Sequence, residues 1–344
     1  MSNANLCIVV VSYNRQLALN KLFKHLSPIL SNNVSLFVSD DSDSKNLYLS
    51  KMADRSLNFF YNHNAPALGH DRNIEKALSF SKSNFTWLIG DSIIPDIDFL
   101  QSFYKTANID HSGYILSSQN PRYNYYNSNQ PIIDYNFLFK KFFWFCTQTG
   151  SMIYNTKLLK RVLKNNQIKK YYSTNFFQLA IFYEMNFLNC NVGVINKRCF
   201  TLSKYRYGSY WYSKIIDVFC KDFNKIVNVL PSKNLSLTEI NQIVRSHDTF
   251  TGLFSSRICF YCIGKGYISK EVISENLEYV SSATDIEKLR YFLMYRPFFI
   301  VFALCVDIFW FFKKKAAKFE ISLVSHTYLF KKNYNNNINN NNQN

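Results

Sequence analysis

The first part of the chain alternates short apolar runs with segments in which apolar residues recur at helical spacing. The apolar runs occupy residues 6–12, 34–38, 57–61 and 85–89. Between the first two, leucines recur every three or four residues, and the same period returns after Gly69. Strands that alternate with helices in this order form βαβ units around a parallel sheet. The pattern therefore predicts an α/β fold in which strand 85–89 is buried.

Polar residues follow three of these strands. The first strand ends in SYNR at 12–15, the second is followed by SDDS at 39–42 and the fourth by GDS at 90–92. The carboxyl ends of parallel strands meet at one edge of a sheet, where open α/β sheets bind ligands, so these residues predict a ligand site. Asp and Ser after a strand are also common turn formers, and for Asp40 and Asp41 both interpretations stay open.

The charge of the chain narrows the class of ligand. The sequence holds 40 Lys and Arg against 23 Asp and Glu, a net charge of +17. This excess points to an anionic partner, which is nucleic acid, a phosphorylated small molecule or a membrane surface. No GxGxxG follows the first strand, and neither GxxxxGKS nor GxxxxGKT occurs. Their absence argues against a dinucleotide dehydrogenase and a P-loop NTPase.

The order of these motifs resembles a known enzyme family. A strand with SYNR, a strand with SDDS, a helix that begins GHDRN and a strand that ends WLIGD are typical of inverting family 2 glycosyltransferases with the GT-A fold. GHDRNIEKAL followed by WLIGD is most similar to the abequosyltransferase-like bacterial members, which build O-antigen and related surface glycans. The resemblance covers roughly residues 5–160. It implies a nucleotide-sugar donor.

The resemblance also implies roles for individual residues. Ser12, Tyr13 and Asp41 would hold the base and ribose, Arg72 and Asn73 would lie near the diphosphate, and Asp91 would orient the donor through a divalent metal. The donor-binding residues predicted in this way are Ser12, Tyr13, Arg15, Asp40, Asp41, Arg72, Asn73 and Asp91.

The metal-binding motif is shorter than in the relatives, which carry two or three acidic residues at this strand end. Here Asp91 stands alone, so the predicted Mn²⁺ or Mg²⁺ would rely on one carboxylate, water and the donor phosphates. A literal DxD follows at 96–98, after a proline and before an apolar helical segment. We predict that Asp96 or Asp98 is a helix N-cap rather than a metal ligand.

The acceptor side and the catalytic base are less clearly marked. Residues 142–146 and 152–154 resemble the acceptor-side strand pair of the family, although a plain strand turn is an open alternative. The residues between them that would approach the acceptor are Thr147, Thr149, Gly150 and Ser151. Sugar transfer with inversion needs a base, and relatives often carry an acidic pair at the start of the next helix. Residues 173–178 contain no acid, which leaves Glu184 as the candidate base or as a solvated helix charge.

The C-terminal part predicts helices and a membrane contact. We divide the chain into a glycosyltransferase domain at 1–215, a helical appendage at 216–295, an apolar and basic membrane-associating segment at 296–330 and an Asn-rich disordered tail at 331–344. The apolar run at 297–312 is short for a membrane span and is followed by three lysines. An interfacial helix is therefore predicted, with a buried core helix as the alternative.

These features predict a glycosyltransferase that is peripheral on the cytoplasmic face of the cell membrane and acts on a lipid-linked oligosaccharide. The N-terminus lacks the basic region of a secretory signal, in keeping with this location. Two other interpretations are a catalytically degenerate GT-A domain and a basic nucleic-acid-binding protein. Acidic residues at the strand ends disfavour nucleic acid as a partner.

Overall fold

The computed structural model describes residues 5–116, 130–203, 210–231, 235–309 and 311. A mixed sheet of seven strands has the order β3-β2-β1-β4-β7-β6-β8, and β5 and β9 form a separate antiparallel pair. The strands are β1 (Leu6–Ser12), β2 (Val34–Asp40), β3 (Phe59–His63), β4 (Phe85–Gly90), β5 (Ile93–Pro95), β6 (Gly113–Leu116), β7 (Met152–Asn155), β8 (Val192–Ile195) and β9 (Phe200–Leu202). β1 to β4 are mutually parallel, and β7 runs antiparallel to its neighbours β4 and β6. The predicted α/β fold with a mostly parallel sheet is confirmed.

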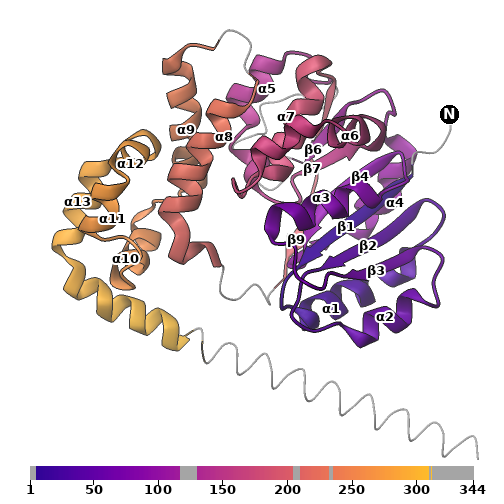
Figure 1. Ribbon diagram of the computed structural model, residues 1–344, viewed down its shortest axis with the longest axis horizontal. Helices are drawn as coiled ribbons and strands as arrows, with labels where there is room; N and C mark the ends of the chain where they lie inside the picture. The colour runs from indigo at the N-terminus through magenta and orange to yellow at the C-terminus, as the bar shows by residue number, and fades with distance from the viewer. Residues whose placement is uncertain (1–4, 117–129, 204–209, 232–234, 310, 312–344) are drawn as a thin grey trace, which may run out of the picture.

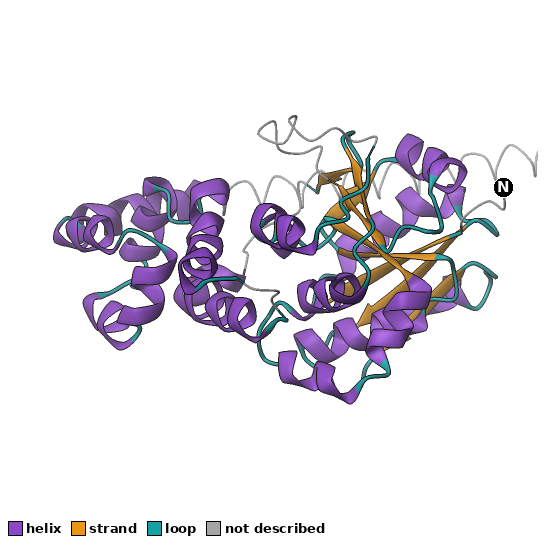
Figure 2. Ribbon diagram, turned by 90° about the horizontal axis from the view of Figure 1, so that it is seen from above, coloured by secondary structure: helices purple, strands orange, loops and turns teal. Residues whose placement is uncertain are grey.

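Helices cover both faces of the sheet (Figure 2). Those that belong to the sheet domain are α1 (Gln16–Leu26), α2 (Leu47–Ala53), α3 (His70–Phe80), α4 (Ile97–Thr106), α5 (Tyr135–Phe142), α6 (Thr156–Leu163) and α7 (Phe177–Leu188). One face of β1 packs in a hydrophobic cluster with α1, α2 and α4, and its other face packs with α3, α6 and α7. Alternate residues of β1 belong to the two clusters: Ile8 packs with α1, α2 and α4, and Val9 packs with α3, α6 and α7. The buried, apolar character of this strand follows directly.

The C-terminal helices share a core with the sheet domain. They are the π-helix η6 (Asp217–Asp222), α8 (Phe223–Val229), α9 (Leu237–Thr251), α10 (Ser256–Gly264), α11 (Lys270–Glu275), α12 (Leu277–Ala283) and α13 (Ile286–Met294), followed by a helix at Arg296–Phe309. Figure 1 shows α8 and α9 beside α5 and α7, with α10 to α13 beyond them. Phe223, Ile243 and Val280 belong to the same hydrophobic cluster as Val9 of the central strand. The described residues between 216 and 295 are mostly helical and pack onto the sheet domain through a continuous core.

One predicted element is wrong. Residues 142–146 do not form a strand, because α5 ends at Phe142 and a 3₁₀ turn runs from Phe145 to Thr147. The run is apolar throughout and fully buried, and a run of that kind does not distinguish strand from helix by its period. The second predicted strand of the pair is confirmed as β7.

Several predictions concern residues outside the described part of the chain. They include most of the cationic and aromatic segment at 204–211, the lysines at 313–315 and the tail at 331–344. Within the described helices, none is by itself both long and apolar enough to cross a membrane. Only α13 and the helix Arg296–Phe309 together reach that length and composition, and they are bent by 88°.

Candidate active site

The site centres on the point where the strand order reverses. β1 pairs with β2 on one side and with β4 on the other. The connections that follow β1 and β4 therefore run toward opposite edges of the sheet. Crevices at such switch points are where open α/β sheets bind ligands. Val11 pairs with Gly90 in the register, which places Ser12 and Asp91 next to each other at the mouth.

Asp91 is held by two groups from the first strand end. Ser12 Oγ donates a hydrogen bond of 2.7 Å to Asp91 Oδ2, and Arg15 Nη1 lies 3.5 Å from Asp91 Oδ1. Burial raises the pKa of this carboxyl group, and the Arg15 charge and the Ser12 hydrogen bond oppose the rise. The site therefore combines a mostly buried carboxylate with a guanidinium that is 30% exposed and can also face a ligand.

Asp40 is fully buried and is hydrogen-bonded to the turn that follows it and to β3. Its Oδ2 accepts a hydrogen bond of 2.8 Å from Tyr61 Oη, and its Oδ1 accepts from the backbone N and the hydroxyl of Ser42. Its negative charge also raises the pKa of Asp91. These contacts give Asp40 a structural role at the end of β2, while its predicted contact with a donor stays a prediction.

Asp41 organises the loop that leads into α3. Its Oδ1 accepts hydrogen bonds from Asn64 Nδ2 at 2.8 Å and from the Leu68 backbone N at 3.1 Å, and its Oδ2 accepts from the Gly69 backbone N at 2.8 Å. Gly69 has a φ of +81°, a conformation that favours glycine. Asn73 joins the same network through Asn64, with 3.2 Å between the two side chains. Asp41 thus positions the start of α3 beside the strand ends.

We expect Asp41→Ala to lower the free energy of unfolding by about 2–4 kcal/mol, because it leaves three donors without their acceptor. Asp43→Ala is the matched control on the same turn, since Asp43 is exposed, and it should change stability by about 0.5 kcal/mol or less. Urea unfolding of both variants measures the difference. If Asp41→Ala were as stable as the control, the result would indicate that water replaces the carboxylate and that the loop does not depend on Asp41.

The exposed groups at this edge are aromatic and cationic. Tyr13 is 58% exposed, and its hydroxyl lies 3.4 Å from Asp43 Oδ1. Arg72 is exposed on the first turn of α3, with its guanidinium 5.8 Å from the centre of the Tyr172 ring. Together with Arg15, these residues offer a ring for stacking and two positive charges, which suits a base attached to phosphates.

The segment predicted to face the acceptor lies against the end of β4 and β5. A Cβ atom on Gly150 would meet Ile93 Cδ1 at 2.5 Å, and the Gly150 carbonyl accepts a hydrogen bond of 2.9 Å from Trp87 Nε1. Thr147 Oγ1 lies 3.2 Å from Nε2 of His247 on α9. Burial lowers the pKa of His247 to about 3, so this histidine is neutral. Thr149 is half-buried and Ser151 is buried.

The sequence patterns did not mark four polar residues near the edge of the sheet where β1 and β4 end. They are His247, Asp71, Asn175 and Asp222. Asp71 follows Gly69 closely, and its acidic position in the first turn of α3 was the one available signal. The others come from segments far apart in the sequence, and no local pattern marks them. The predicted base Glu184 accepts a hydrogen bond from Tyr171 and lies 3.3 Å from Lys170 Nζ, and its catalytic role stays a prediction.

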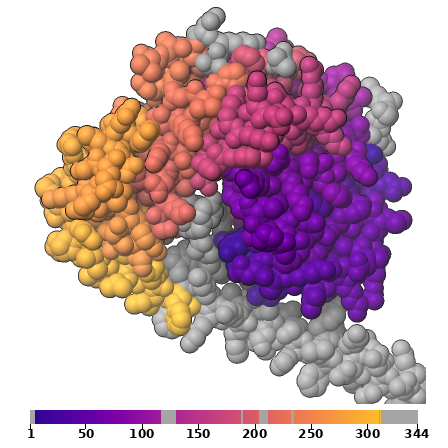
Figure 3. Space-filling view, viewed as in Figure 1, coloured from indigo at the N-terminus to yellow at the C-terminus, as the bar shows by residue number. Residues whose placement is uncertain are grey.

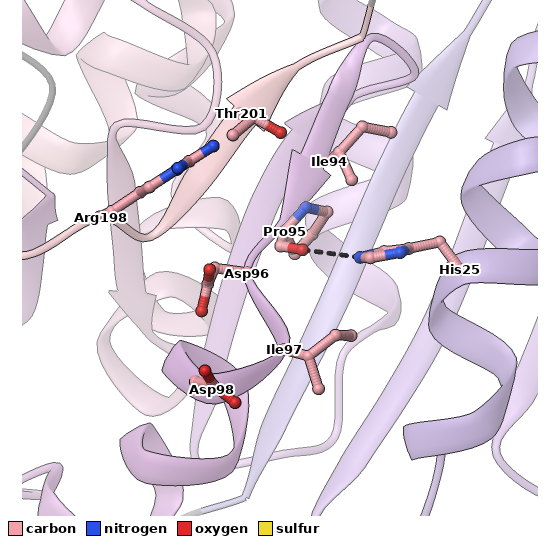
Figure 4. A pocket seen from close by; sticks show the side chains of 8 residues that line it. All are labelled: His25, Ile94, Pro95, Asp96, Ile97, Asp98, Arg198 and Thr201. Carbon is pink, nitrogen blue, oxygen red and sulfur yellow. Dashed lines mark hydrogen bonds between the residues drawn. The ribbon is translucent and has the colours of Figure 1, made fainter.

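A cavity of about 260 Å³ lies elsewhere, between the end of α1, β5, β9 and the start of α4 (Figure 4). It is lined by His25, Ile94, Pro95, Asp96, Ile97, Asp98, Arg198 and Thr201. The lining includes none of the strand-end residues. Asp96 Oδ1 accepts a hydrogen bond of 2.9 Å from the Phe99 backbone N and caps α4, which confirms the N-cap prediction. The literal DxD is thus part of a helix start and not of the strand-end site.

The strand-end site offers limited ligation for a metal ion. Within the described residues, no group of three His, Cys, Asp or Glu side chains is arranged to hold one. Both oxygens of Asp91 already face a donor, Ser12 or Arg15. Mg²⁺ often keeps several waters and binds through one or two carboxylates together with substrate phosphates. Asp91 fits that mode as a single ligand.

Comparisons with known proteins identify the fold. No family model matches the sequence, and no curated protein does. The crystal structure of S. aureus TarS 1-349 matches with a TM-score of 0.52 and 14% identity, over 88% of each chain. The same protein in complex with UDP-GlcNAc matches with a TM-score of 0.50, 14% identity and 88% of each chain. A mannosyltransferase, PcManGT from Pyrobaculum calidifontis, in complex with GDP-Man and Mn²⁺, has a TM-score of 0.47 and 10% identity, over 90% of this chain and 88% of that one.

The chain therefore has the GT-A fold of glycosyltransferases, with a mostly parallel sheet flanked by helices.

Proposed function

We propose that this protein is a glycosyltransferase that uses a nucleotide-sugar donor. The observation that carries the proposal is Asp91 at the switch point of the sheet, bonded to Ser12 and paired with Arg15. The similarity of the fold to a protein crystallised with UDP-GlcNAc supports the same class of ligand. The net charge of +17 suits a donor that carries a diphosphate.

In the proposed reaction an acceptor hydroxyl attacks the anomeric carbon of the donor sugar. The bond from that carbon to the diphosphate oxygen breaks, and its electron pair leaves with the nucleoside diphosphate. Arg15 and Arg72 stabilise the negative charge on this leaving group. The nucleotide base stacks on the ring of Tyr13. A divalent metal held by Asp91 would add electrostatic stabilisation of the same charge.

The finer assignment rests on the sequence motifs and on an exposed apolar surface. We propose a hexosyl or deoxyhexosyl transfer with inversion, to a lipid-linked oligosaccharide of a bacterial surface glycan, because GHDRN and WLIGD resemble abequosyltransferase-like enzymes. The helix Arg296–Phe309 exposes several large apolar side chains and is flanked by basic residues in the sequence. These features favour a location on the cytoplasmic face of the membrane.

One observation favours a second candidate, which is a GT-A domain that binds a nucleotide without turnover. Asp91 is a lone carboxylate, and no described group of three His, Cys, Asp or Glu side chains around it could complete a metal site. A protein of this kind would bind a nucleotide-sugar and release no nucleoside diphosphate from it.

A thermal-shift screen tests the proposal and separates the two candidates. The probes are UDP-, GDP-, dTDP- and CDP-linked sugars, each with and without MnCl₂, on the full chain. We expect one nucleotide class to raise the Tm, followed by slow release of nucleoside diphosphate when water replaces the acceptor. Binding without release would favour the non-catalytic candidate, and no shift with any probe would contradict both.

A further inference from the structure

The loop before α7 holds a strained backbone. Ser173 has a φ of +62° and Asn175 a φ of +59°, values in the left-handed region that non-glycine residues rarely adopt. In the described part of the chain only Asn14, at the end of β1, shares this conformation among non-glycine residues. Strain of this kind persists where the surroundings hold it and is concentrated at functional sites. Two hydrogen bonds anchor residues 173–176.

The first anchor connects the loop to the strand-end site. The backbone N of Thr174 donates a hydrogen bond of 3.3 Å to Asp71 Oδ2. Asp71 lies in the first turn of α3, two residues after Gly69, whose backbone N is bonded to Asp41. The loop consequently borders the same edge of the sheet as the predicted donor site.

The second anchor comes from the C-terminal helices. Asn175 Nδ2 donates a hydrogen bond of 2.7 Å to Oδ2 of Asp222, the last residue of the π-helix η6. π-Helical turns are rare and often occur at functional sites. Asp222 Oδ1 accepts no hydrogen bond from any residue that the structure describes, so one oxygen is available to another donor. In the space-filling view the orange C-terminal helices lie directly against the magenta part of the sheet domain (Figure 3).

The electrostatic surroundings of Asp222 favour proton uptake. Burial raises the pKa of its carboxyl group, and the charge of Asp217 raises it further. The Asn175 hydrogen bond and the charges of Lys225 and Lys221 lower it, and burial is the largest of these effects. A carboxylate with a raised pKa is a stronger base than one in water.

The other acids near the loop are already engaged. Glu184 accepts a hydrogen bond from Tyr171 and is paired with Lys170. Asp71 accepts on both oxygens, from His70 Nδ1 at 2.8 Å and from Thr174. Asp222 differs from these two acids in its partner, because the neutral amide of Asn175 is the one group among the described residues that is hydrogen-bonded to it.

We propose that Asp222, supplied by the helical C-terminal part and oriented by Asn175, is the base of the sugar transfer. The proposal rests on the proposed function. As the acceptor oxygen bonds to the anomeric carbon, its proton passes to Asp222 Oδ1, and the electron pair of the broken carbon–oxygen bond leaves with the nucleoside diphosphate. The amide of Asn175 holds the carboxylate of Asp222 through the hydrogen bond of 2.7 Å to its Oδ2.

Asp222→Asn tests the proposal on the full chain, because it keeps the shape of the side chain and removes its basicity. We expect release of nucleoside diphosphate from the nucleotide-sugar with the largest Tm shift to fall roughly 100-fold or more. The affinity for that nucleotide-sugar, measured by calorimetry, should stay within about 3-fold of the wild type, since a 3-fold change is less than 1 kcal/mol. In the wild type the rate should fall at acidic pH as Asp222 is protonated, and Asp222→Asn should lose this dependence.

Asp217→Asn is the matched control, because Asp217 lies exposed on the same π-helix, and Glu184→Gln tests the rival base. Asp217→Asn should keep the rate within about 3-fold of the wild type. Asp222→Glu should recover part of the rate if a carboxylate is what the reaction needs. Full activity of Asp222→Asn, or loss of activity in Glu184→Gln alone, overturns the proposal. A wild-type protein that binds no nucleotide-sugar contradicts the proposed function instead, a result that calorimetry distinguishes.

Discussion

Asp91→Asn is expected to lower sugar transfer roughly 100-fold or more while the protein stays folded. The carboxylate is mostly buried and lies at the switch point of the sheet, bonded to Ser12 Oγ and 3.5 Å from Arg15 Nη1. A group preorganised near the leaving diphosphate stabilises charge that develops in the transition state, and removing one such group costs about 10²–10³ in rate. The asparagine keeps the size of the side chain and can still accept the serine hydrogen bond. The measurement is nucleoside diphosphate release at saturating donor.

Asp96→Ala is the matched control for this prediction. Asp96 belongs to the literal DxD, and its side chain accepts a hydrogen bond from the Phe99 backbone N at the start of α4. Losing this cap should cost about 1 kcal/mol of stability and leave transfer near the wild-type rate. An active Asp91→Asn together with a folded but inactive Asp96→Ala would indicate that the donor binds at Asp96 and Asp98 instead of at Asp91.

The second large effect is expected at the membrane. Val301 and Ile308, on the helix Arg296–Phe309, are 61% and 55% exposed. If this face inserts into the interface, the double variant Val301→Glu/Ile308→Glu should lose binding to vesicles of phosphatidylglycerol and phosphatidylcholine by roughly 100-fold or more. Each aliphatic side chain contributes about 1.5–3 kcal/mol when it is buried, and the added negative charges repel anionic lipid. Vesicle sedimentation measures the change.

Point substitutions test this surface better than truncation, because the other side of the helix belongs to the protein core. Ala303 is buried, and Phe299 stacks on Phe260 of α10 with 4.1 Å between ring centres. The matched control is Leu57→Glu/Leu237→Glu, which changes two exposed leucines and adds the same charge elsewhere. Equal loss in both double variants would indicate a general charge effect, and unchanged binding in the helix variant would point to residues 204–211.

On the same helix, Asp307 has a role that the sequence alone does not show. In the sequence Asp307 interrupts an apolar run and would be costly in hydrocarbon. In the structure its carboxylate accepts a hydrogen bond of 3.0 Å from Tyr261 Oη on α10 and one of 2.8 Å from Nζ of Lys265, the residue directly after α10. Asp307 therefore joins this helix to α10 and leaves the exposed face apolar.

Local patterns determined the elements of this protein. The period of apolar residues predicted β1 to β4 and the helix after Gly69, and the structure confirms them. The sequence also predicted the N-cap at Asp96, which caps α4 in the structure, and a second local cap, the capping box of Ser236 and Glu239, begins α9. Hydrogen bonds at a helix end join residues two or three positions apart, so their signal lies within a few letters of sequence. The resemblance of the strand-end motifs also led to the GT-A fold.

The tertiary structure alone decided how the polar groups are used. Asp41 and Asp91 both follow buried strands, yet one binds the loop before α3 and the other faces Arg15 at the mouth of the site. The pairing of Asn175 with Asp222 joins residues 47 positions apart, and the shared core of sheet and C-terminal helices joins residues more distant still. Contacts of this kind depend on which surfaces pack together, and burial then sets the partners and the pKa of each group. Neither periodicity nor spacing along the chain carries that information.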